Sequence, residues 1–193
     1  MKGILFTEPL FHRVVSGEKT QTRRTIKPQP DFISENFHWA KKNNGDVILP
    51  RYGVGEKLYL KEPYFIDSPV IYKYDSYKDD HLICEWQNKL FMPEKYARYF
   101  IEITGVRCER LQDISDEDCF REGIVETQCI SEGNFNPVYE NGLNLTDRKG
   151  CTLIKQYDTP QEAYAALIDS ISGRDTWKSN PYVWVYDFKL TKK

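Results

Sequence analysis

The sequence lacks a long hydrophobic run, a cysteine pair with metal-ligand spacing and an excess of charge of one sign. A helix that crosses a bilayer needs about 18 or more consecutive apolar residues, so we expect no membrane anchor and a cytoplasmic location. Because 27 Lys and Arg residues oppose 29 Asp and Glu residues, the formal net charge is −2. This balance excludes a polycationic tail that binds nucleic acid by total charge. Any nucleic-acid site must therefore be a local patch.

The cysteines are odd in number, never form a C-x-x-C, and are accompanied by only three histidines. A structural zinc site needs four converging ligands, which are usually supplied as closely spaced pairs. The sequence therefore predicts no metal site, no cofactor and no disulfide framework. Free thiols are among the most buried groups in proteins, so we expect five buried, reduced cysteines: Cys84, Cys108, Cys119, Cys129 and Cys151.

Length and hydrophobic periodicity predict one domain over residues 1–193, built from many short strands and a few helices. Strands are expected at 2–6, 20–25, 58–62, 70–74, 99–111 and 182–190, and helices at 9–16, 115–123 and 159–173. Ser115 and Thr159 are the expected N-caps of the last two helices, and Tyr164 belongs to the apolar stripe of the last. The apolar positions of the 99–111 strand change face at Gly105, which predicts a β-bulge there. Two polar segments, about 27–50 and 127–157, are expected to be loop insertions, and the turn signal Asn43-Asn44-Gly45-Asp46 allows one hairpin in the first. The predicted fold class is α+β, a mostly antiparallel β-barrel with peripheral helices and two loop insertions.

A cluster of polar and cationic side chains follows Gly17, a residue suited to ending a helix. In an extended chain Thr20, Thr22 and Arg24 share one face and Arg23 the other, so Lys19 converges with Thr22 only from a turn. Guanidinium groups suit phosphate or planar acceptors, which favours an anion or nucleobase site. A solvated, charged strand is the alternative, because most charge runs are surface. The candidate binding residues are Lys19, Thr20, Thr22, Arg23 and Arg24.

The pattern Gly17-x-Lys19-x-x-x-x-Arg24 resembles the signature of the ASCH domain, a PUA-like β-barrel family, and lies after an N-terminal strand and helix as it does in that family. In the family this signature is at the mouth of a cleft proposed to bind RNA or a nucleoside. Further segments resemble the larger, often phage-associated members: 52–58, 92–93, 111–124, 177 and 180–185. The resemblance leaves only the two insertions poorly covered, and it implies a PUA-like fold and an RNA or nucleoside ligand.

Thr22 departs from the usual ASCH signature, which has a Glu three residues after the Lys. The Lys19 and Thr22 spacing instead resembles the bacterial acetylcytidine amidohydrolases, a compact ASCH branch with a catalytic Lys, Thr and Glu. Laying that branch's helix on residues 115–123 puts Glu122 at the position of its Glu. The resemblance thus implies Thr22 as nucleophile, Lys19 as base and Glu122 as acid, without a metal.

Three functions follow as expectations. The first is binding of RNA or a modified nucleoside in the cleft, and Trp39 in the first insertion could cover a base. The second is a metal-independent amidohydrolase that deacylates N-acylated cytidine. The third is a phage-encoded interaction protein whose cleft is vestigial. The near-neutral charge favours a nucleoside or short RNA over a long duplex. Trp184 lies on the apolar face of its predicted strand and is therefore assigned to the core rather than to the site.

Overall fold

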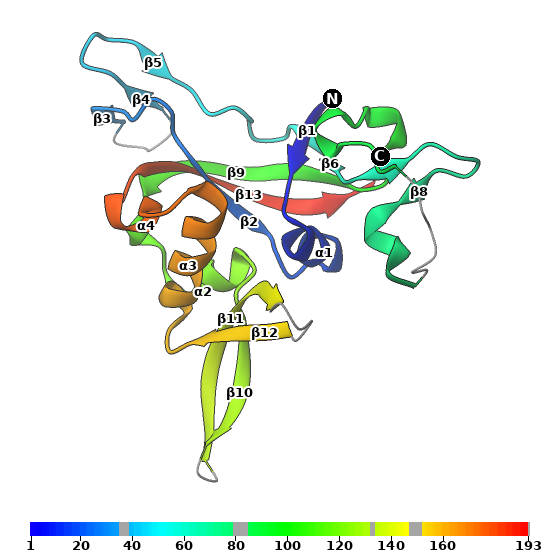
Figure 1. Cartoon of the computed structure of the whole chain (residues 1–193). Helices are drawn as coiled ribbons and strands as arrows, with labels where there is room; N and C mark the ends of the chain where they lie inside the picture. Colours follow the sequence, from blue (N-terminus) through cyan, green and yellow to red (C-terminus); the bar gives the residue numbers. More distant parts are fainter. Residues whose placement is uncertain (35–38, 79–84, 132–133, 147–151, 193) are drawn as a thin grey trace.

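A five-stranded sheet forms the centre of the computed structural model, which describes residues 1–34, 39–78, 85–131, 134–146 and 152–192 (Figure 1). Only the β1–β6 pair is parallel, and the other neighbours are antiparallel. The order across the sheet is β1 (Lys2–Leu5), β6 (Lys57–Lys61), β9 (Phe100–Arg110), β13 (Tyr182–Thr191) and β2 (Gln21–Thr25). The long alternating segments predicted at 99–111 and 182–190 therefore become the two central neighbours β9 and β13.

The predicted β-bulge in β9 is confirmed. Asp187 of β13 pairs with Gly105, and the next residue, Phe188, pairs with Ile103, so Thr104 has no opposite residue. A Cβ atom on Gly105 would lie 2.8 Å from Oδ2 of Asp187. The carboxylate therefore approaches the backbone at a place where only glycine leaves room.

Helices α1 (Glu8–Ser16), α2 (Asp116–Arg121) and α3 (Pro160–Ser172) lie on one side of the sheet, and α4 (Thr176–Ser179) follows α3 (Figure 1). The backbone N–H of Glu162 donates to the Thr159 hydroxyl, and that of Asp118 donates to the Ser115 hydroxyl, each at 3.2 Å. Both side chains satisfy N–H groups that the first turn of a helix leaves unpaired. The two predicted N-caps are thus confirmed.

Both segments expected to be loop insertions contain small antiparallel sheets. Segment 27–50 holds β3 (Phe32–Ile33), β4 (Ala40–Lys41) and β5 (Val47–Ile48), and the second sheet comprises β10 (Val125–Ser131), β11 (Asn134–Thr146) and β12 (Thr152–Tyr157). The hairpin allowed in the first segment is present as β4 and β5, but the third strand there and the sheet of the second segment were not predicted. Both sheets project from the central sheet in Figure 1. Their strands pair mainly with one another rather than burying a continuous apolar face, so the alternation that identifies a strand is weak. A shorter pair, β7 (Tyr64–Phe65) and β8 (Ile71–Tyr72), and 3-10 turns at Lys73–Lys78, Lys89–Phe91, Glu94–Tyr96 and Leu111–Asp113 complete the described elements.

The architecture is α+β, as predicted, but the central sheet does not close into the predicted barrel. Among the described strands, β1 pairs only with β6 and β2 only with β13. The two edges nevertheless approach each other. Nη2 of Arg24 on β2 donates a hydrogen bond to the carbonyl oxygen of Leu5 on β1 at 2.7 Å. We call this gap between β1 and β2, bridged by Arg24, the seam.

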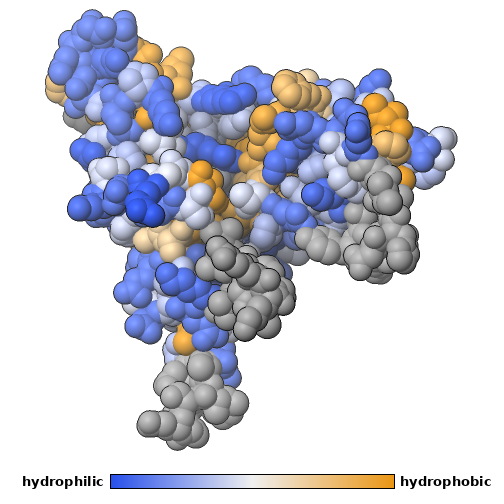
Figure 2. Space-filling model, viewed as in Figure 1, coloured by the Kyte–Doolittle hydropathy of each residue, from blue (hydrophilic) through white to orange (hydrophobic). Residues whose placement is uncertain are grey.

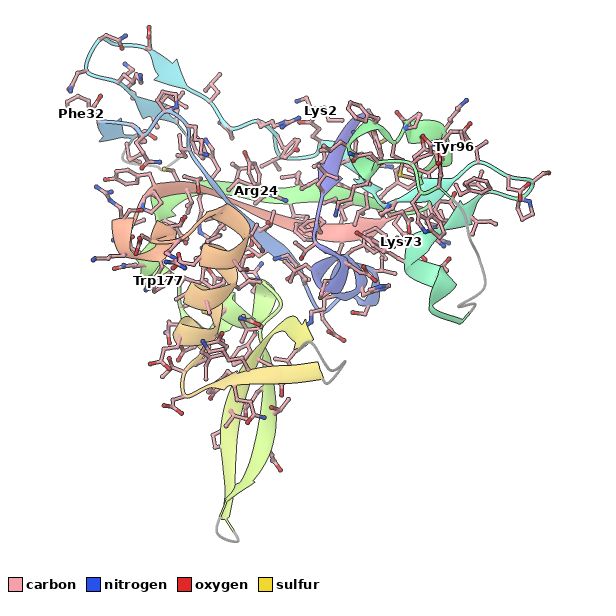
Figure 3. All side chains as sticks on the ribbon, viewed as in Figure 1. Lys2, Arg24, Phe32, Lys73, Tyr96 and Trp177 are labelled. Carbon is pink, nitrogen blue, oxygen red and sulfur yellow. The ribbon has the colours of Figure 1, made fainter. Side chains whose placement is uncertain are left out.

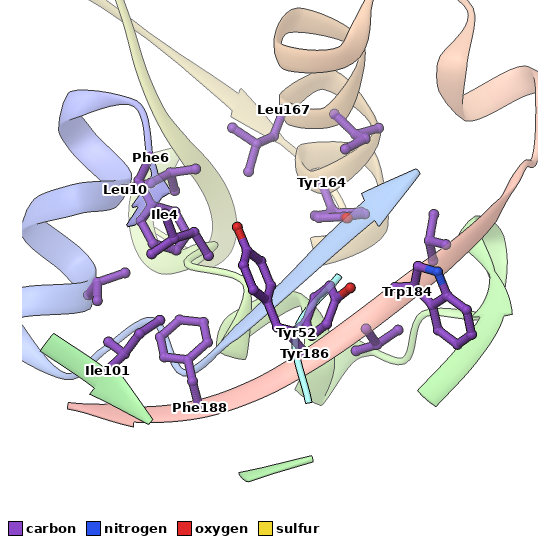
Figure 4. Close-up of a cluster of buried hydrophobic side chains, with 14 of the residues drawn as sticks. Ile4, Phe6, Leu10, Tyr52, Ile101, Tyr164, Leu167, Trp184, Tyr186 and Phe188 are labelled. Atoms are coloured by element: carbon purple, nitrogen blue, oxygen red, sulfur yellow. The ribbon is translucent and has the colours of Figure 1, made fainter. Parts of the chain in front are cut away.

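The core lies between the sheet and the helices and is rich in aromatic rings (Figure 4). Tyr52 and Tyr186 meet with ring centroids 5.3 Å apart, and Trp184 is only 4% exposed, which confirms its assignment to the core. Cys108 and Cys119 are free and buried as expected, and burial raises the pKa of each thiol to about 12. Cys84 and Cys151 lie outside the described residues, and the side chain of Cys129 is not described.

The surface in the view of Figure 2 is mainly hydrophilic, with a hydrophobic band near β1 and the N-terminus. Among the helices of the described ranges, none combines the length and the apolar character needed to cross a membrane.

Candidate functional site

The charged motif occupies the connection between α1 and β2. Gly17 ends α1 with a left-handed φ of 84°, and Lys19 lies in the turn before β2 begins at Gln21. The N–H of Lys19 donates to the carbonyl of Arg13 at 2.9 Å, and that of Thr20 donates to the carbonyl of Arg121 at 3.0 Å. The connection is therefore held by its backbone against α1 and α2, and Lys19 has the turn position that convergence with Thr22 requires.

A small cavity of about 80 Å³, here called the motif pocket, lies beside this connection. The structure brings five of the predicted site residues to its lining: Lys19, Thr22, Arg23, Arg24 and Glu122. Tyr164 and apolar residues of β1, α1 and α3 complete the wall. Since a water molecule occupies about 30 Å³, the motif pocket has room for two or three waters or a small chemical group.

Lys19 and Glu122 form a buried ion pair in the wall of the motif pocket. Nζ of Lys19 donates to Oε2 and to the backbone carbonyl of Glu122, both at 2.6 Å, and the two side chains are 1% and 5% exposed. Burial lowers the pKa of Lys19, and the guanidinium groups of Arg24 and Arg23 lower it further against the opposing attraction of Glu122. Glu122 caps the C-terminus of α2, where an acid is unfavourable unless a cation compensates it, as Lys19 does.

Arg23 holds Glu122 from the other side. Its fully buried guanidinium donates through Nη1 to Oε1 of Glu122 at 3.3 Å and through Nη2 to Glu109 at 2.5 Å and Asp118 at 2.7 Å. Burial alone lowers the pKa of Arg23, but these carboxylates outweigh it and the net shift is upward. Arg23 therefore positions Glu122. Sequence spacing did not reveal Glu109 and Asp118, because β9 and α2 are remote from the motif along the chain.

Two buried hydroxyl groups in the lining of the motif pocket have no protein partner within the described ranges. They are Oη of Tyr164, a residue only 1% exposed, and Oγ1 of Thr7; Thr22 lines the same pocket. Burial raises the pKa of Tyr164 well above its ordinary value, so its phenol stays protonated. Unpaired buried hydroxyls are costly, and a ligand that bonds them recovers that cost. The sequence predicts Tyr164 only as part of an apolar helix stripe.

Two predicted binding residues lie outside both cavities described here. Thr20 lines neither; it joins the turn to the sheet, where its carbonyl accepts from the N–H of Phe188 at 2.8 Å. Trp39 lies beside β4 and is 37% exposed, and Nζ of Lys41 is 4.8 Å from its ring centroid. Neither side chain is positioned to act on a ligand in the motif pocket.

A larger cavity of about 550 Å³ adjoins the motif pocket at the seam, and we call it the cationic cavity. Leu5, Arg24 and Thr25 line both cavities, so Arg24 lies between them, near the centre of the molecule (Figure 3). Burial lowers the pKa of Arg24. The remaining wall comes from β1, β5, β6 and β13, from the residues after β2 and β5, and from the 3-10 turn Lys89–Phe91: Gly3, Ile4, Ile26, Lys27, Ile48, Leu49, Arg51, Tyr52, Lys61, Leu90, Trp184 and Tyr186. Of these residues, the sequence had identified only Arg24 as a ligand-binding candidate.

A search of the described residues finds no group of three or more His, Cys, Asp or Glu side chains placed to hold a metal ion. The expectation of a metal-independent site stays a prediction. No protein-family model, curated protein or solved structure matches this chain. A functional conclusion therefore has to come from the residues of the site.

Proposed function

We propose that this chain is an ASCH-type, PUA-like cytoplasmic protein that binds RNA or a modified nucleoside across the motif pocket and the cationic cavity. The observation that carries the proposal is the position of Arg24, which lines both cavities next to a buried Lys19–Glu122 pair and two partnerless hydroxyls. Guanidinium and hydroxyl groups in a small, mostly buried pocket are suited to recognising the polar edge of a base or ribose.

The volumes of the two cavities indicate which part of the ligand each can hold. Sites for small molecules occupy about 300–1,000 Å³, a range that includes the cationic cavity at about 550 Å³ but not the motif pocket at about 80 Å³. The body of a nucleoside therefore belongs in the cationic cavity. Only a small substituent reaches the motif pocket, where the hydroxyls of Thr22 and Tyr164 can bond it.

Equilibrium binding of cytidine, N-acetylcytidine and short RNAs to the purified chain tests this function. Thr22→Val should weaken binding about twofold to tenfold, the effect of one neutral hydrogen bond. Arg24→Gln should weaken it more, because contacts to a charged donor are stronger. Thr20→Val is the matched control, since Thr20 lies beside the motif but lines neither cavity. Equal losses for Thr20→Val and Thr22→Val, or no binding of any probe, would contradict the proposal.

A second candidate is an amidohydrolase that removes an acyl group from a cytosine amine. The lowered pKa of Lys19 and the position of Thr22 in the same pocket favour it. The reaction starts from the neutral form of the pair, in which the proton between Nζ and Oε2 lies on Glu122 and Lys19 is a free amine. Lys19 then takes the proton of the Thr22 hydroxyl while Oγ1 bonds to the acyl carbon. The C–N bond then breaks, Glu122 gives a proton to the leaving amine, and water hydrolyses the resulting ester. Because Nζ of Lys19 donates to Glu122 in this structure, catalysis requires it to turn toward Thr22.

Incubation with N-acetylcytidine, followed by chromatography for cytidine and acetate, tests the second candidate. Thr22→Val should abolish turnover and leave binding nearly intact. Glu122→Gln should reduce the rate by about 10²–10⁴-fold, the usual contribution of a general acid. Circular dichroism of each variant separates loss of chemistry from loss of folding. Wild-type chain that binds acylated cytidines and hydrolyses none would leave binding as the function.

A further inference from the structure

Four cationic side chains line the cationic cavity, and its described lining contains no carboxylate: Arg24, Lys27, Arg51 and Lys61 are the cations. Their protein contacts are to neutral groups. Arg24 donates to the carbonyl of Leu5, and Lys61 donates to that of Leu90, both at 2.7 Å. The guanidinium of Arg51 lies 5.5 Å from the ring centroid of Tyr52. No ion pair joins any of the four to an acid within the described ranges.

Four arginines elsewhere in the fold, Arg23, Arg98, Arg107 and Arg121, each form ion pairs with Asp or Glu side chains, several of them with two or three partners. Single cations such as Lys89 and Arg110 donate to backbone carbonyls instead, at 2.9 and 3.1 Å. What distinguishes the cationic cavity is that four such cations line one space together. Lys27 and Arg51 are exposed at the cavity's rim, whereas Arg24 and Lys61 are half-buried. Like charges gathered in one concave space repel one another, and an anion that enters relieves this repulsion.

We propose that the cationic cavity is a phosphate-binding subsite, so that the ligand of this protein is a nucleotide unit rather than a bare nucleoside. The proposal rests on the proposed function, which supplies the nucleoside part. A phosphate offers several acceptor oxygens and one to two negative charges, which suits two guanidinium forks and two ammonium groups. The apolar wall of Tyr52, Trp184 and Tyr186 accommodates the ribose or base attached to it.

The phosphate can belong to a free mononucleotide or to one unit of an RNA strand, and both present the same chemistry to the four cations. The position of Arg24 between the cavities sets the direction of the ligand. Its phosphate lies among Lys27, Arg51 and Lys61, and its small substituent lies beside Thr22. An acidic peptide would also meet positive charge here, but it would have no use for the motif pocket.

Binding measurements on the full chain with five probes test the subsite: cytidine, cytidine 5′-monophosphate, a mixed-sequence RNA hexamer, pyrophosphate and hexaglutamate. The phosphate should strengthen binding of the mononucleotide about tenfold or more over cytidine. The double variant Lys27→Gln/Arg51→Gln should bring this ratio close to one. Lys189→Gln is the matched control: it removes a cation from β13, outside the cavity, whose Nζ lies 3.5 Å from Glu102. For the hexamer, loss of two phosphate contacts should flatten the dependence of log Kd on log salt by about 0.7 per contact.

A hexamer that binds with the expected dependence on Lys27 and Arg51 while the mononucleotide does not would assign the subsite to a strand, and the reverse result to a free nucleotide. Equal affinity for cytidine and its monophosphate, with a hexamer indifferent to the double variant, would overturn the subsite and leave nucleoside binding standing. Pyrophosphate binding that needs Lys27 and Arg51, without binding of any nucleoside or RNA, would support the subsite and overturn the proposed function. Hexaglutamate binding as tightly as the hexamer would overturn the assignment to phosphate, and failure of all five probes would overturn both.

Discussion

Replacing Glu122 by Gln tests how the motif pocket is held together. The change keeps the shape of the side chain but removes the charge that faces Nζ of Lys19 at 2.6 Å and Nη1 of Arg23 at 3.3 Å. Arg23 retains Glu109 and Asp118, so its charge stays compensated. Lys19 has no second carboxylate among the described residues and keeps only the backbone carbonyl of Glu122. The cost of this substitution therefore falls mainly on Lys19.

The magnitude has a ceiling, because a stranded lysine can release its proton. Deprotonating a lysine of ordinary pKa 10.5 at pH 7 costs about 4.8 kcal/mol, at about 1.36 kcal/mol per pH unit, and the cost in the fold is smaller because burial already lowers the pKa of Lys19. Loss of one partner from a buried pair usually costs about 3–5 kcal/mol. Glu122→Gln should therefore lower the free energy of unfolding by about 3 kcal/mol at pH 7, at the lower end of that range. Lys19→Met should cost less, since the Glu122 carboxylate retains Arg23.

Urea denaturation at pH 7 and pH 9.5 measures both effects. In Glu122→Gln the pKa of Lys19 in the folded chain falls further below its unfolded value. The unfolded state then binds more protons than the folded state, and the stability of this variant should rise with pH toward 10.5 relative to wild type. In the double variant Lys19→Met/Glu122→Gln that rise should disappear, and the two costs should be far from additive. Equal, additive costs below about 1 kcal/mol would refute the buried-pair reasoning.

Three further predictions concern the fold. Gly105→Ala should cost about 1–3 kcal/mol, because its Cβ would lie 2.8 Å from Asp187, whereas Gly53→Ala, with nothing within 4 Å of its Cβ, should be nearly neutral by urea denaturation. Cys119→Ala should change how the free energy of unfolding depends on pH. The Cys119 thiol has a pKa of about 12 in the fold but near 9 when unfolded, so the wild-type free energy of unfolding falls as pH rises from 9 to 12. The variant should flatten that fall by up to about 1.36 kcal/mol per pH unit, and an unchanged slope would argue that Cys119 is not buried as a thiol. Thr159→Ala should cost about 1 kcal/mol through loss of the N-cap of α3, seen as a lower urea midpoint at constant m value.

Local signals predicted much of the fold. Strict alternation gave β13, the change of face at Gly105 gave the bulge, and Thr159 and Ser115 marked the starts of α3 and α2. These features depend on residues close together along the chain. Apart from the β4–β5 hairpin, the two small sheets were missed because their strands are short or polar and pair mainly with each other. The sequence also predicts a barrel, whereas the described strands form an open sheet, because closure depends on how far β1 and β2 curl toward each other and not on local signals.

The sequence predicted the part of the candidate site that is formed by the 17–24 motif and by Glu122 at the C-terminal end of α2. Lys19, Thr22, Arg24 and Glu122 line one pocket, and the turn at Gly17 provides the reason. Arg51 and Lys61 gave no local signal, because their common position depends on the path of the segment after β5. Tyr164 was hidden in an amphipathic stripe, where a phenol and an apolar ring look alike. Residue spacing along the chain cannot predict a site whose residues come from segments that are far apart in the sequence.

The seam also offers a way to search for the ligand without a guess about chemistry. Anything lodged in the cationic cavity touches both β1 and β2, the two ends of the sheet order, and so connects strands that otherwise meet through the Arg24 hydrogen bond. A compound that binds only the folded chain stabilises it by RT ln(1 + [L]/Kd), about 2.7 kcal/mol at a concentration 100 times Kd. In a chain of this size that gain amounts to several degrees in the melting temperature. A thermal-shift screen of nucleotides, nucleosides and cell extracts can therefore find ligands of the folded chain, and loss of the shift in Lys27→Gln/Arg51→Gln assigns them to the cavity.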